Sequence, residues 1–121
     1  MKKDYRVPGA EAWRFAFPFA AVPKGARVLI YGGGIVGKTY VEEIRRTGHC
    51  RIAALADKRP RSVNLEEVRI ISPEGIASEK FDLLLIALER QDWAVEVWRN
   101  LREMGGRERK MRWIDPGREN S

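Results

Sequence analysis

The feature that most constrains the fold is a glycine-rich turn between a short apolar segment and an amphipathic one. Residues 27–31 read Arg-Val-Leu-Ile-Tyr, which is typical of a strand buried on both faces of a sheet. Residues 32–37 read Gly-Gly-Gly-Ile-Val-Gly, and a helical apolar pattern runs from Ile35 to Thr47. This order predicts a strand, a tight turn and a helix that packs back on the strand.

The predicted helix is followed at once by a second strand. Its buried stripe consists of apolar residues three or four positions apart: Val36, Tyr40, Val41 and Ile44. Glu42 and Arg46 are expected to pair on the outer side, and Gly48 is expected to end the helix. Residues 51–56 then predict a strand that ends at Asp57.

The remaining chain continues to alternate strand and helix signals. Strands are expected at residues 68–71, 81–88 and 111–114, the first of them a short edge strand because the polar link before it is too short for a helical crossover. Two helices are expected, one starting with Ser72 as N-cap and one with Asp92. The second has an apolar stripe expected to cover the sheet: Trp93, Val97 and Leu101, with Trp98 and Met104 beside them. The pattern predicts an α/β, Rossmann-like three-layer domain with a mainly parallel sheet of about five strands.

Two phosphate-binding patterns overlap at the glycine-rich turn. Residues 32–37 match G-x-G-x-x-G, whereas residues 32–39, which add Lys38 and Thr39, also match the P-loop pattern G-x-x-x-x-G-K-[ST]. Either pattern presents backbone N–H groups and a helix N-terminus to an anion. A purely structural glycine turn is a third alternative.

An acidic residue favours the dinucleotide-type turn. Asp57 lies 57 − 37 = 20 residues after Gly37, where such sites carry a carboxylate that accepts hydrogen bonds from a ribose hydroxyl. A turn residue at the strand end is the alternative for Asp57. The predicted nucleotide-binding residues are Gly32, Gly33, Gly34, Ile35, Val36, Gly37, Asp57 and Lys58. The predicted ligand is NAD(H) or a nucleotide sugar.

The segment from Phe17 to Lys38 resembles a bacterial Rossmann-like module that accompanies cell-surface polysaccharide enzymes. It is similar in particular to the N-terminal nucleotide-sugar-binding domain of sugar O-acyltransferases, over about residues 15–115. The resemblance implies that Gly32, Gly34 and Gly37 line a diphosphate and that Asp57 contacts the nucleoside. The hexapeptide-repeat β-helix of those acyltransferases is absent from this sequence, so their acetyl-transfer activity does not carry over.

Candidate catalytic residues are few. His49 is the only histidine and Cys50 the only cysteine, and both are expected to be structural. The Tyr-x-x-x-Lys pair of short-chain dehydrogenases is missing. A binding or regulatory module is therefore predicted. The alternatives are a small oxidoreductase or sugar-modifying enzyme that completes its site by dimerising, and a P-loop phosphohydrolase.

Length and charge limit the remaining function classes. The chain has 121 residues, enough for one domain, expected at residues 24–117 with a polar tail at 118–121. Its net charge is +6, but the basic residues are mixed with acidic ones, so nucleic-acid binding is not expected. No membrane span or disulfide is expected, which favours a cytoplasmic location.

The first 23 residues are unusually aromatic. They contain Tyr5, Trp13, Phe15, Phe17 and Phe19. This strap, residues 1–23, is expected either to fold over the sheet or to join the module to a second copy or another domain.

Overall fold

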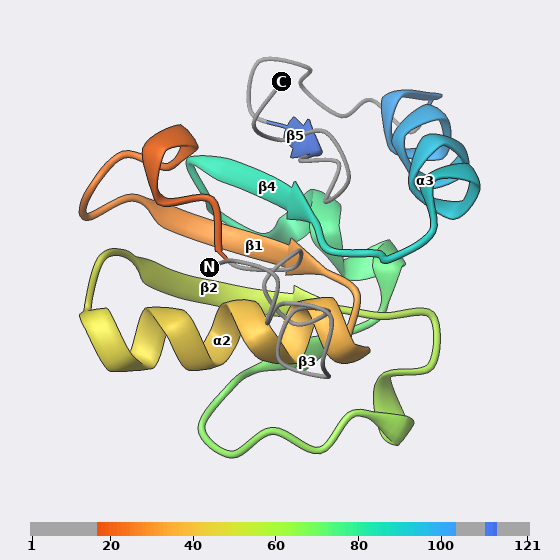
Figure 1. Ribbon diagram of the computed structural model, residues 1–121. Coiled ribbons are helices and arrows are strands. Elements are labelled where there is room, and N and C mark those ends of the chain that lie inside the picture. Colours follow the sequence, from red (N-terminus) through yellow and green to blue (C-terminus); the bar gives the residue numbers. More distant parts are fainter. Residues whose placement is uncertain (1–16, 104–110, 114–121) are drawn as a thin grey trace, which may run out of the picture.

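The computed structural model describes residues 17–103 and 111–113, and its centre is a parallel sheet (Figure 1). Its strands are β1 (Arg27–Tyr31), β2 (Arg51–Ala56), β3 (Ile70–Ile71), β4 (Leu83–Ile86) and β5 (Met111–Trp113). They lie in the order β3-β2-β1-β4-β5, and every neighbouring pair is parallel. The predicted α/β class with a mainly parallel sheet is confirmed.

Alternate strand residues face two separate cores. Val28, Ile30, Leu55 and Leu85 pack with helix α2 (Ile35–Thr47), on what we call the α2 face. Leu29, Tyr31, Leu84 and Ile86 pack with helix α3 (Gln91–Glu103), on the α3 face. The strand residues in both sets are buried, which explains why β1 and β4 read as continuous apolar runs.

The first half of the domain agrees closely with the elements predicted from the sequence. β1, α2 and β2 have the predicted bounds, and the stripe of Val36, Tyr40, Val41 and Ile44 is buried. Gly48 has a φ of 66°, and its N–H donates to the Ile44 carbonyl oxygen at 2.7 Å, as a helix-ending glycine should. One pairing was wrong, because the Arg46 guanidinium contacts Glu43 at 2.5 Å and not Glu42.

The second half departs from the expected element lengths. β3 covers Ile70–Ile71 and β4 Leu83–Ile86, both shorter than expected. The segment after β3 is the 3₁₀ helix η4 (Pro73–Ser78), and the Ser72 side chain makes no cap hydrogen bond. α3 starts at Gln91, so Asp92 lies in its first turn and not at the N-cap.

The stripe of α3 is only partly as predicted. Val97 and Leu101 are buried, together with Ala94. Trp93 is 49% exposed, because its ring packs against the Arg90 guanidinium, 4.5 Å from the ring centroid, and not against the sheet. Met104 lies outside the described residues.

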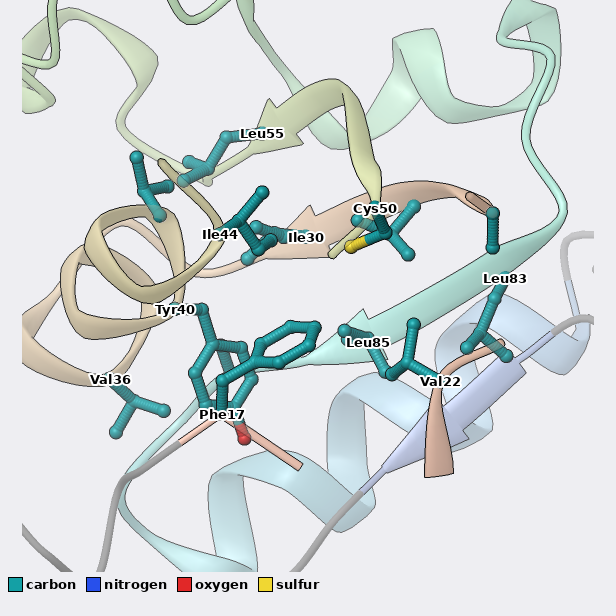
Figure 2. Close-up of a cluster of buried hydrophobic side chains, with 14 residues drawn as sticks. Phe17, Val22, Ile30, Val36, Tyr40, Ile44, Cys50, Leu55, Leu83 and Leu85 are labelled. Atoms are coloured by element: carbon teal, nitrogen blue, oxygen red, sulfur yellow. The ribbon is translucent and has the colours of Figure 1, made fainter. Parts of the chain in front are cut away.

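Two aromatics of the N-terminal strap pack on the chain's own core. Phe17 is buried, and its ring meets the Tyr40 ring edge-on with centroids 5.3 Å apart (Figure 2). Phe19, at the start of the 3₁₀ helix η2 (Phe19–Ala21), lies 5.1 Å from the His49 ring. For these two residues the chain itself provides the cover. Residues 1–16 and the tail at 118–121 lie outside the described part.

Two further properties of the described residues concern function. Among these helices, none is both long and apolar enough to cross a membrane. The same part of the chain contains no group of three or more His, Cys, Asp or Glu side chains that could hold a metal ion.

Candidate functional site

The turn between β1 and α2 is held so tightly that two of its glycines are sterically required. Gly32 has a φ of 119°, and a Cβ atom there would lie 2.5 Å from the Ala87 carbonyl oxygen. A Cβ atom on Gly37 would overlap the Gly32 carbonyl oxygen, so the first turn of α2 sits directly on the end of β1. Gly32 and Gly37 therefore have structural reasons to be glycine, whatever the turn binds.

Asp57 joins the end of β2 to the glycine-rich turn. Its Oδ2 accepts a 2.7 Å hydrogen bond from the Gly33 N–H, and its Oδ1 accepts one of 2.8 Å from the Arg59 N–H. Asp57 thus acts as a turn residue at the end of β2, the alternative considered for it from the sequence. Each carboxylate oxygen can accept a second hydrogen bond, and the side chain is only half-buried, so Asp57 keeps capacity for a ligand hydroxyl.

Gly34 is different from its neighbours. It is the N-cap residue of α2, no side chain caps the helix, and a Cβ atom at Gly34 would meet nothing within 4 Å. The Lys38 N–H donates to the Gly34 carbonyl oxygen at 2.9 Å, so the regular helix ladder begins there. The N–H groups of the three preceding residues, 35–37, have no partner within an α-helix. At this positive end of the helix dipole Gly34 and Ile35 are exposed, whereas Val36 and Gly37 are buried.

The two residues that create the P-loop pattern lie inside the helix. Only residues 32–34 separate β1 from α2, so no wide phosphate-wrapping loop is formed. Lys38 is the fourth residue of α2 and is exposed. The Thr39 hydroxyl donates to the Ile35 carbonyl oxygen at 2.8 Å. The Thr39 hydroxyl is thereby engaged with the backbone of its own helix.

A cavity of about 330 Å³ opens on the α3 face beside the carboxyl ends of β1 and β2. Its walls come from four segments and consist of Tyr31, Lys58, Pro73, Glu74, Val97, Asn100 and Leu101. Lys58 was predicted as a site residue, and the structure places it in the wall of this cavity. The others were missed, because their proximity depends on the placement of η4 and α3, which no local pattern encodes.

The wall of this cavity has an unusual titratable group. Tyr31 is the last residue of β1 and only 5% exposed. Burial raises the pKa of the Tyr31 hydroxyl above its usual 10.0, and the negative charges of Asp57 and Glu74 raise it further. The cavity wall therefore presents a neutral hydroxyl near two carboxylates, one of which also holds the glycine-rich turn.

Comparison with known proteins places the chain in a family. Residues 24–112 match the family described as C2185-like, N-terminal. The chain belongs to this family. The matched range begins just before β1 and ends within β5, so it contains the glycine-rich turn, Asp57 and the whole cavity wall. No curated protein matches the chain.

In this member of the C2185-like N-terminal family, His49 and Cys50 have structural surroundings. The His49 ring nitrogen Nε2 lies 2.7 Å from the Val22 carbonyl oxygen, which ties the strap to the link between α2 and β2. Cys50 is buried in the core of the α2 face, and burial raises the pKa of its thiol. A raised thiol pKa lowers the thiolate fraction at neutral pH, which does not suit a nucleophile.

Proposed function

We propose that the chain is a Rossmann-like three-layer module that binds NAD(H) or a nucleotide sugar at its glycine-rich turn. In this proposal the phosphates lie against Gly34 and the exposed amino end of α2, and Asp57 accepts a hydrogen bond from the ribose. The observation that carries the proposal is the open space at Gly34.

Gly34 differs from Gly32 and Gly37 in having no steric reason to be glycine. Side chains are excluded at Gly32 and Gly37 by the fold itself, whereas nothing in the described chain excludes one at Gly34. Glycine at an exposed position with room for a side chain is expected where a ligand must approach the backbone closely. The adjacent N–H groups of α2 are suited to an anion such as a phosphate.

The strand order supports the same location. In open parallel sheets ligands bind outside the carboxyl ends of the strands, where the connections change direction. Here β1 lies between β2 and β4, and the chain leaves β1 toward β2 on one side and later returns to β4 on the other. The glycine-rich turn lies at this point, at the carboxyl end of β1.

The geometry favours the dinucleotide-type turn over a P-loop. A P-loop requires a loop that surrounds the phosphates and a lysine that contacts them. The three-residue turn and the position of Lys38 four residues into α2 suit a shorter approach of the backbone to a diphosphate.

By resemblance, the module belongs to the cytoplasmic stage of bacterial cell-surface polysaccharide biosynthesis and has no catalysis of its own. His49 and Cys50 lie in structural settings, and no catalytic residue is proposed from the described chain. Binding and presentation of the nucleotide are the proposed activity.

The test compares Gly34→Val with the parent chain in calorimetric titrations of NAD, NADH and UDP-sugars. We expect at least a hundredfold loss of affinity, because the valine occupies the space of the phosphate. The free energy of unfolding should fall by no more than about 1 kcal/mol, the usual effect of an unfavourable N-cap. Ala20→Val, which adds the same kind of bulk on exposed η2, is the control and should bind normally. Unchanged affinity in Gly34→Val would place the site elsewhere.

A further inference from the structure

The cavity on the α3 face has the composition of a small-molecule subsite. Its apolar wall is formed by Pro73, Val97 and Leu101, and its polar groups come from Tyr31, Lys58, Glu74 and Asn100. Small-molecule sites combine such an apolar lining with a few polar groups, and a volume of about 330 Å³ is at the small end of their usual range. The cavity therefore suits part of a ligand, about one ring system.

The cavity adjoins the proposed phosphate site through two pairs of consecutive residues. Tyr31 lines the cavity, and Gly32 begins the glycine-rich turn. Lys58 lines the cavity, and Asp57 binds the N–H of Gly33. After burial, the negative charge of Asp57 contributes to the raised pKa of Tyr31, in keeping with a carboxylate beside the cavity wall. A ligand held at Asp57 by its ribose would have its next group at the mouth of the cavity.

We propose that the cavity is the subsite for the nucleobase of a nucleoside diphosphate whose phosphates lie at the amino end of α2. This proposal rests on the nucleotide-binding function proposed above. The apolar wall of Val97 and Leu101 covers the face of the base, and Tyr31, Asn100 and Lys58 offer hydrogen-bond donors to its ring nitrogen or carbonyl acceptors. Glu74 and the amide oxygen of Asn100 accept hydrogen bonds from the N–H groups of the base.

The chemistry of the wall restricts what else could enter. A further phosphate would meet the Glu74 carboxylate as well as the Lys58 ammonium group, and a purely apolar group would pair with none of the polar groups of the wall. A flat ring with both donors and acceptors on its edge satisfies them. The nucleobase is therefore the part of a nucleotide that this cavity fits.

The experiment measures affinity for two probes, inorganic pyrophosphate and whichever of UDP and ADP binds the parent chain more tightly. Asn100→Trp places a large side chain at the exposed rim of the cavity and leaves the core unchanged. We expect this variant to bind the nucleotide at least tenfold more weakly and to bind pyrophosphate within twofold of the parent. Arg99→Trp, the same change one residue away outside the cavity wall, is the control and should keep the parent's ratio of the two affinities.

A second variant tests the polar wall without changing its volume. Tyr31→Phe removes one donor, and we expect a three- to tenfold loss of nucleotide affinity, about the effect of one hydrogen bond, with no change for pyrophosphate. In the parent, NMR cross-relaxation should connect protons of the base with methyl groups of Val97 and Leu101.

The possible outcomes separate the two proposals. If the parent binds nucleotide and Gly34→Val abolishes binding, but Asn100→Trp keeps the parent's ratio, the base lies elsewhere and only the cavity proposal is overturned. Equal weakening of both probes by Asn100→Trp also overturns it. If the parent binds neither probe, the proposed function fails and the cavity proposal fails with it.

Discussion

The two faces of the sheet are built from the same strands but are closed very differently. On the α2 face the strands are covered by α2, by the aromatic residue Phe17 and by apolar residues of the link between β2 and β3. On the α3 face the corresponding cover is α3 and the short η4, and a cavity remains between them. Alternation along a strand thus fixes which residues face each side, whereas the length of the connections decides whether that side is filled.

The glycine-rich turn belongs to the tightly closed face, and its glycines should differ sharply in their tolerance to change. We expect Gly37→Ala to lower the free energy of unfolding by about 3 kcal/mol or more, because the new methyl group overlaps the Gly32 carbonyl oxygen and α2 must move. Gly34→Ala, in the same turn, should change it by no more than about 1 kcal/mol. Urea unfolding of both variants measures the difference, and similar losses in the two would contradict the close contact.

Truncation of one core side chain on each face compares their packing directly. We expect Ile44→Ala, on the α2 face, to cost about 4 kcal/mol and Leu101→Ala, on the α3 face, to cost about 2 kcal/mol. Leu101 already borders the cavity, so it loses fewer packing contacts on truncation. Equal losses in chemical denaturation would mean that the cavity does not loosen the α3 face.

The link that helps to cover the α2 face contains a strained residue. Glu67 has a φ of 61°, a conformation that costs an L-residue about 1–2 kcal/mol. A glycine there avoids this cost but loses about 0.5–1 kcal/mol more backbone entropy on folding. Glu67→Gly should therefore stabilise the domain by up to about 1 kcal/mol in thermal unfolding. Glu66→Gly, next to it and without a positive φ, is the control and should be destabilising.

The smallest expected effect concerns Tyr31 and depends on pH. Because its pKa is raised in the folded chain, the unfolded chain loses the proton first, near pH 10.0. The contribution of the protonated hydroxyl to stability is therefore complete below pH 10.0 and is lost as the pH rises through the folded pKa. We expect the stability of the parent to fall more steeply than that of Tyr31→Phe above about pH 10. Parallel pH profiles would show that Tyr31 is not buried near the two carboxylates.

The difference between the faces also explains how far the sequence could predict the structure. The bounds of β1, α2 and β2 follow from local signals, namely an apolar run, a glycine-rich turn, a helical stripe and Gly48. The α3 face depends on distant contacts. Nothing local indicates that Trp93 pairs with Arg90 and leaves the core, or that η4 is too short to fill the space beside α3.

The candidate site divides in the same way. The spacing from Gly37 to Asp57 indicated an acidic residue at the end of the second strand, and this carboxylate lies against the turn because both are at the carboxyl ends of neighbouring parallel strands. That Asp57 would bind the Gly33 N–H, and that Lys58 would line a cavity with Glu74 and Asn100, required three-dimensional information. The bound nucleotide itself stays a prediction.

The central position of β1 also has a consequence for the order of folding. β1 pairs with β2 across 51 − 27 = 24 residues, but with β4 across 83 − 28 = 55 residues. Closing the longer loop costs about 0.7 kcal/mol more in chain entropy, so a nucleus of β1, α2 and β2 is favoured. The glycine-rich turn lies inside that nucleus, whereas the cavity exists only after β4 and α3 have joined it. Local opening of α3 in the native state can therefore remove Val97 and Leu101 from the cavity wall while the turn at Gly34 stays formed.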